Sequence, residues 1–125
     1  MATVCIGFKD WKADFVERGL SRQTIRGRWK RPVKVGDTLK FYRYWRTKNA
    51  RRFGTATCTA ARPIRIGEGN VILDGIWLSS PEADSLADRD GFADQFAMRS
   101  WFREQYGLPF EGVVIEWGEL REKGG

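Results

Sequence analysis

The sequence contains no histidine, the side chain whose ordinary pKa lies nearest neutrality. This absence excludes Ser-His-Asp hydrolysis, Cys-His proteolysis and paired-histidine ribonuclease chemistry. Any catalysis must therefore use Lys, Tyr, Ser, Thr, Arg or carboxylates whose pKa values the fold has shifted.

Cysteine is almost as scarce as histidine. Cys5 and Cys58 are the only thiols, and without histidine they cannot complete an ordinary zinc site. Both are flanked by apolar or small residues, so we expect buried, reduced thiols. The aspartates between residues 84 and 94 fit no calcium loop and are better explained as helix caps or as partners of basic groups. No metal site and no small-molecule cofactor are predicted.

Long hydrophobic runs are missing as well. No stretch of eighteen apolar residues exists, and the first ten residues lack the features of a signal peptide. We therefore expect a cytoplasmic protein with no membrane partner. A chain of 125 residues with 42% hydrophobic content predicts one domain, residues 1–118, followed by a flexible tail, residues 119–125. A monomer is expected.

Positive charge is abundant but unevenly placed. Residues 1–66 hold 17 Lys and Arg against 4 Asp and Glu, whereas residues 67–125 hold 5 against 12. Within the first half, residues 18–52 carry thirteen cations and a single acid, Asp37. A solvated face is the ordinary explanation of a charge run. Cations concentrated to this degree instead favour a polyanion partner, because binding releases its counterions.

Several short segments rich in β-branched and aromatic residues predict strands. The predicted strands are residues 2–7, 38–45, 53–61, 71–78 and 113–117, and residues 21–27 are expected to form a loop or a short strand. Asp10 is expected to cap a short helix that stops at Gly19, and two further helices are expected over 80–86 and 94–106. The predicted fold class is α+β, a small mixed β-barrel or curled sheet with two or three flanking short helices.

Aromatic rings alternate with cations in the basic half. The rings concerned are Trp29, Tyr42, Tyr44 and Trp45. Single-stranded nucleic acid is bound by this combination, because bases stack on rings, at about 1 to 3 kcal/mol each, while cations follow the phosphates. We expect Trp29 to be exposed and Trp45 to be buried. The remaining tryptophans are expected in the core: Trp11, Trp77, Trp101 and Trp117.

An ordered set of short motifs runs through nearly the whole chain. The motifs are residues 19–26 (GLSRQTIR), 35–39 (VGDTL), 46–48 (RTK), 90–92 (DGF), Met98, 101–102 (WF), 106–107 (YG) and 112–117 (GVVIEW). Together they resemble the signature of ASCH domains, most clearly the phage-type branch of that family. The resemblance implies a PUA-like β-barrel fold with a cleft lined by Thr24 and Arg26, and a function tied to RNA.

The same resemblance implies two activities found among relatives, cleavage of single-stranded RNA and deacetylation of N4-acetylcytidine. In the amidohydrolase branch a lysine precedes the threonine by three positions and acts with it and a downstream glutamate. Here Ser21 holds the lysine position, and Asp88 or Asp90 would have to replace the glutamate. This weakens the amidohydrolase interpretation, although a lysine from elsewhere in the cleft would restore it.

A metal-independent ribonuclease site would draw on three catalytic candidates, Tyr44, Lys48 and Thr24. Tyr44 or Lys48 with a lowered pKa would activate the ribose 2′-hydroxyl, and neighbouring arginines would stabilise the phosphorane. The simpler alternative is that Lys48 and its neighbours hold phosphates without cleaving anything. Arg26 likewise has two interpretations: it binds a phosphate or base edge, or it pairs with Asp88 or Asp90.

The sequence thus predicts an RNA-binding protein, with single-stranded RNA preferred and DNA as a second polyanion. The residues expected to bind RNA are Arg22, Thr24, Arg26, Arg28, Trp29, Lys30, Arg46, Lys48, Arg51 and Arg52. Two alternatives stay open: an amidohydrolase acting on a modified nucleoside, and a protein-interaction adaptor that docks through the acidic residues 84–94.

Overall fold

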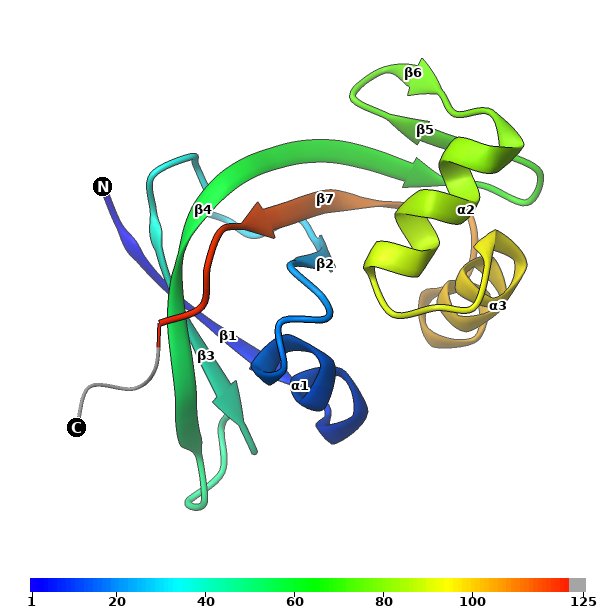
Figure 1. The fold of residues 1–125 in the computed structure, drawn as a ribbon. Coiled ribbons are helices and arrows are strands. Elements are labelled where there is room, and N and C mark those ends of the chain that lie inside the picture. Colours follow the sequence, from blue (N-terminus) through cyan, green and yellow to red (C-terminus); the bar gives the residue numbers. More distant parts are fainter. Residues whose placement is uncertain (122–125) are drawn as a thin grey trace.

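The computed structural model describes residues 1–121, which form seven strands and three helices (Figure 1). In chain order they are β1 (Thr3–Phe8), α1 (Asp10–Glu17), β2 (Gln23–Gly27), β3 (Thr38–Arg43), β4 (Arg51–Ile66), β5 (Val71–Leu73), β6 (Ile76–Trp77), α2 (Ser80–Arg89), α3 (Gln95–Tyr106) and β7 (Phe110–Trp117). The predicted α+β class is confirmed.

The long strand β4 organises the sheet, arching across the whole molecule (Figure 1). Its first part pairs antiparallel with β3, which in turn pairs parallel with the edge strand β1. Its later part pairs antiparallel with β7, and β2 pairs with the other side of β7. β5 and β6 extend the far end. The sheet is mixed and does not close, so the predicted barrel is not confirmed.

Two hydrophobic cores lie along this arch. The first core packs α1 against β1, β3 and the start of β4, and includes the rings of Phe8, Phe41 and Trp117. The second core packs α2 and α3 against the far end of β4, with Leu86 and Phe102 among its fully buried side chains. Figure 1 shows α1 and the α2–α3 pair at separate places along the sheet. The two cores meet where α1 lies against the segment after α2, through Lys12 with Asp90 and Trp11 with Phe92.

Local signals for the helix ends were largely correct. Asp94 caps α3, its side chain accepting a hydrogen bond from the backbone of Ala97. Ser79 caps α2 through a reciprocal pair with Glu82. The cap of α1 was predicted one residue late, because Asp10 is the first helical residue and the cap position is Lys9.

Burial of the tryptophans departs from the prediction. Trp117 is buried, but Trp77 is 68% and Trp11 40% exposed, and Trp45 is 38% exposed while Trp29 packs against the first core. Trp77 is exposed because the predicted strand 71–78 folds back on itself at Asp74 and Gly75, both with positive φ, which leaves a short edge hairpin.

Two further expectations concern Cys5 and the chain end. Cys58 is buried as expected, whereas Cys5 is exposed on the edge strand β1. In the region predicted as tail, Leu120 packs against the first core and the backbone of Arg121 bonds to Thr55. Residues 122–125 of that region lie outside the described part of the chain. No helix within residues 1–121 has the length and apolar character needed to cross a bilayer.

Candidate functional site

A cavity of about 130 Å³ lies where the two cores meet, and we call it the inner cavity. The end of β1, the start of α1, β2, the segment after α2 and one face of α3 enclose it. Its polar lining consists of Lys9, Lys12, Thr24, Arg26 and Asp90, and its aromatic lining of Phe8, Trp11, Phe92, Trp101, Phe102 and Tyr106.

A buried ion pair forms the floor of the inner cavity. Lys12 Nζ lies 3.5 Å from Asp90 Oδ1, and both side chains are less than one-tenth exposed. The ammonium also donates to Ser21 Oγ at 3.0 Å and to the backbone carbonyl of Asp90. The carboxylate accepts a further bond from Gln23 Nε2 at 3.3 Å. Both charges are therefore paired and hydrogen-bonded, as burial requires.

Burial shifts the proton affinities of both members of this pair. Desolvation raises the pKa of Asp90 to about 6, against the opposing attraction of the Lys12 cation. Desolvation likewise lowers the pKa of Lys12, and Asp90 opposes that shift. A carboxyl and an amine whose pKa values have both shifted toward neutral pH can accept and donate protons near that pH. The inner cavity thus has acid-base groups although the sequence has no histidine.

The position of Lys12 depends on a second ion cluster on the outer face of α1. Arg43, itself buried at the end of β3, donates to Asp14 at 2.6 Å and to Glu17 at 3.0 Å, and contacts Asp10 at 3.4 Å. The three acids lie on one side of the helix. Their attachment to Arg43 turns the opposite side, which carries Lys12, toward the inner cavity.

Arg26 stands between the inner cavity and the protein surface. Its Nε donates to Thr24 Oγ1 at 3.0 Å, its Nη2 donates to the carbonyl of Gly7 at 2.7 Å, and its guanidinium lies 5.0 Å from the centre of the Phe8 ring. Of the two interpretations of Arg26, an ion pair with Asp88 or Asp90 is not found within residues 1–121, because Asp90 pairs with Lys12. Within residues 1–121, Nη1 of Arg26 has no hydrogen-bond partner, so it can serve a ligand.

A second hollow, the outer hollow, opens on the other side of Gly7 and has a volume of about 500 Å³. Its lining includes Arg26, Trp29, Trp45 and Arg46. Gly7 and Arg26 also line the inner cavity, so these two residues separate the two spaces. The structure thus brings together three residues predicted to bind RNA, namely Arg26, Trp29 and Arg46.

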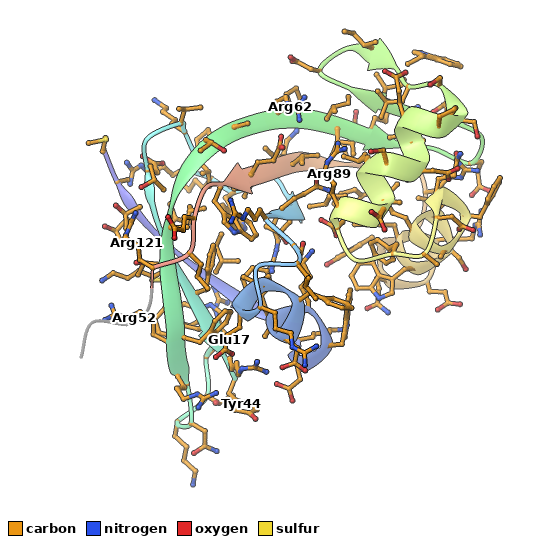
Figure 2. The ribbon with its side chains drawn as sticks, in the orientation of Figure 1. Glu17, Tyr44, Arg52, Arg62, Arg89 and Arg121 are labelled. Carbon is orange, nitrogen blue, oxygen red and sulfur yellow. The ribbon has the colours of Figure 1, made fainter. Side chains whose placement is uncertain are left out.

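Other predicted residues lie elsewhere. Tyr44 and Lys48 are exposed in the connection between β3 and β4 and line neither hollow. Figure 2 shows Tyr44 at the end of the molecule away from α2 and its Arg89. The predicted catalytic grouping is therefore divided, because Thr24 lies in the inner cavity.

The remaining predicted cations are spread over the surface. Arg22 lies beside Arg89 and Glu116, in a different depression. Arg28 and Lys30 are exposed after β2, and Arg51 and Arg52 begin β4, with Arg51 exposed and Arg52 half-buried.

The choice between Asp88 and Asp90 is settled by burial, because Asp88 is exposed whereas Asp90 is 6% exposed and faces Lys12.

Lys12 was not among the site residues predicted from the sequence. Its signal was present: it lies next to Ala13 and four residues before Val16, on the apolar side of the helix. Within the described residues no three carboxylates or thiols converge as metal ligands would.

Comparisons with known proteins add no relative. No protein-family model matches the sequence, and the searches of curated proteins and of solved structures find no match. Function is therefore inferred from the geometry of the inner cavity and the outer hollow.

Proposed function

We propose that this chain is an RNA-binding protein of the ASCH type, with a PUA-like fold, that takes one base of a single strand into the inner cavity. The observation that carries this proposal is the combination at one place of a buried Lys12–Asp90 pair with aromatic walls. Such a site offers a planar ligand both stacking surfaces and hydrogen-bonding groups.

The size of the inner cavity suits one ring. A cavity of about 150 Å³ holds one benzene molecule in a well-studied protein, and the inner cavity measures about 130 Å³. Trp11, Phe92 and Trp101 form a continuous aromatic series, with ring centres 6.1 and 5.9 Å apart. A base entering past Tyr106, which is 65% exposed, would stack on these rings.

The polar groups of the inner cavity suit the edge of a base. Arg26 Nη1, which has no partner within residues 1–121, is a donor, and Asp90 is an acceptor when ionised and a donor when protonated. The Lys12 ammonium, already hydrogen-bonded to Ser21 and Asp90, contributes its positive charge. RNA bases are commonly recognised in this way, splayed out of a single strand and hydrogen-bonded along one edge. Exposed cations outside the cavity, among them Arg28, Lys30 and Arg46, would contact the phosphates.

The test is titration of the purified protein with labelled single-stranded RNA, duplex RNA and single-stranded DNA, at low and high salt. We expect single-stranded RNA to bind best and its affinity to fall with salt. Arg26→Ala should weaken binding at least tenfold, because a charge-assisted hydrogen bond contributes roughly 1.5 to 3 kcal/mol. Arg103→Ala is the matched control, because Arg103 is exposed and paired with Glu68. Unchanged affinity in Arg26→Ala would refute the site.

A second candidate function, hydrolysis of an N-acylated base, is favoured by one specific contact. Lys12 Nζ lies 3.0 Å from the hydroxyl of Ser21, the position at which ASCH amidohydrolases have their lysine. Lys12, on helix α1, thus places an ammonium group beside Ser21, where the amidohydrolases have their lysine. Asp90, buried beside it, would take the role of the downstream glutamate.

The chemistry of this candidate balances without a cofactor. Asp90 would accept a proton from water as the oxygen bonds to the acyl carbon, with Thr24 and Arg26 donating to the carbonyl oxygen. The carbon–nitrogen bond then breaks, and Lys12 gives its proton to the leaving amine. A carboxylic acid and the free base result, and Asp90 returns the proton to Lys12.

Incubation with N4-acetylcytidine, followed by chromatography for cytidine and acetate, tests this candidate. Conversion that disappears in Lys12→Met, with the fold checked by circular dichroism, would establish it. Absence of conversion at high protein concentration would leave binding alone. Ribonuclease activity stays a prediction, and cleavage of RNA in EDTA that is lost in Lys48→Ala would establish it.

A further inference from the structure

Trp45 is held in an unusual way at the wall of the outer hollow. The residues on either side of it, Tyr44 and Arg46, have φ values of 55° and 65°, a left-handed conformation that non-glycine residues seldom adopt. The loop is closed by Thr47, whose hydroxyl donates to the carbonyl of Tyr44 at 2.6 Å and accepts from the backbone of Asn49 at 3.1 Å. Backbone strain of this kind persists only where surrounding contacts impose it.

Gly7 provides one of those contacts. A side chain at Gly7 would place its Cβ 2.3 Å from the Cβ of Trp45, so only glycine permits the indole to lie against β1. The ring also packs on Tyr42, which is the register partner of Gly7 in the neighbouring strand β3, with ring centres 4.7 Å apart. The tryptophan is held by both contacts and is still 38% exposed. An immobilised, exposed indole loses little entropy when a base stacks on it.

Arg26 connects this ring to the inner cavity. Its guanidinium is anchored to the carbonyl of Gly7, at the partition between the two hollows, and Nη1 has no partner within residues 1–121. A guanidinium in this place suits a phosphate that joins two nucleotides. Arg46 and Trp29 lie around the outer hollow, whose volume of about 500 Å³ is several times that of the inner cavity.

We propose that the outer hollow is a second nucleotide subsite: the neighbour of the base in the inner cavity stacks on Trp45, and the phosphate between them binds Arg26. This inference rests on the proposed function and names its ligand as a dinucleotide step. The aromatic walls of the inner cavity then bind the first base, Arg26 binds the phosphate, and Trp45 binds the second base.

The test compares each of the four ribonucleoside 3′-monophosphates with the corresponding homodinucleotide, by isothermal titration. We expect the dinucleotide to bind at least fivefold more tightly, because one base stack contributes about 1 to 3 kcal/mol. A dinucleotide with an abasic second ribose should lose that gain. In Trp45→Ala the gain should also disappear while the affinity for the monophosphate is unchanged, and Trp45→Phe should restore most of it.

Trp77→Ala is the control, because Trp77 is 68% exposed and lies on the β5–β6 hairpin, away from both hollows. If the monophosphate binds but the dinucleotide binds no more tightly, the second subsite is refuted and the proposed function stands. A gain that survives in Trp45→Ala refutes the subsite as well. If neither ligand nor longer RNA binds, both proposals fail.

Discussion

The inner cavity and the outer hollow share Arg26 and Gly7 but differ in almost every other respect. The inner cavity is small and contains charges of both signs that are nearly removed from solvent. The outer hollow is larger, and its charged side chains, the half-buried Arg26 and the exposed Arg46, are both cationic. Charges withdrawn from water acquire shifted pKa values and can carry chemistry, whereas exposed cations attract phosphate and are screened by salt. We therefore assign recognition of a base to the inner cavity and recognition of the strand to the outer hollow.

The largest expected effect concerns the buried pair. Lys12→Ala should lower the free energy of unfolding at pH 7 by roughly 3 to 5 kcal/mol, because the Asp90 carboxylate stays buried without its cation. Urea denaturation measures the change. At pH 5 the loss should be smaller, because the pKa of Asp90 is raised by burial and the carboxyl then holds its proton.

Lys9→Ala is the matched control for that experiment, since Lys9 also lines the inner cavity but is exposed and forms no ion pair within residues 1–121. Its effect should stay below about 1 kcal/mol. The double variant Lys12→Met with Asp90→Leu should recover part of the lost stability, because no charge is then left unpaired. Equal losses in Lys12→Ala and Lys9→Ala would mean that the pair is not a buried one.

The next effect is the pH dependence that Asp90 confers. Its pKa is about 6 in the folded protein against an ordinary 3.8, so the unfolded chain loses this proton first as the pH rises. The contribution of Asp90 to stability is therefore full below about pH 4 and is lost as the pH rises to 6. The loss is about 3 kcal/mol.

Asp90→Asn removes this titration. The stability of the wild type relative to Asp90→Asn should fall by most of that amount between pH 4 and 6.5, as measured by urea denaturation at several pH values. Asp88→Asn is the control, because Asp88 is two residues away and exposed. A difference between wild type and Asp90→Asn that stays constant over this range would contradict the assignment.

The smallest effect distinguishes the two thiols and reports on the outer hollow. Cys5 is exposed and lines that hollow, whereas Cys58 is buried and its pKa is raised by desolvation. A thiol-specific reagent should modify one cysteine quickly in the native protein and the other only on unfolding. Saturating single-stranded RNA should slow the fast reaction. Equal modification rates of Cys5 and Cys58, or a Cys5 rate that RNA does not slow, would contradict binding of RNA in the outer hollow.

Local sequence signals predicted what local interactions decide. The caps at Asp94 and near Ser79, and the helix stop at Gly19 with its φ of 74°, depend on a few neighbouring residues. Strand positions were found for the same reason, although β4 runs longer than the predicted 53–61. Burial of particular rings was not predicted, because it depends on which elements pack over them, as the exposed Trp77 shows.

The sequence by itself determined the absence of histidine, the basic first half and the helix ends, because these follow from composition or from residues a few positions apart. Tertiary structure alone decided the inner cavity. Lys12 and Asp90 are 78 residues apart, and Gly7 and Arg26 are 19 apart, so only the folding of α1 and β2 against the segment after α2 joins them. A charge pattern can indicate a polyanion, but a site with shifted pKa values requires burial, which only the packed fold provides.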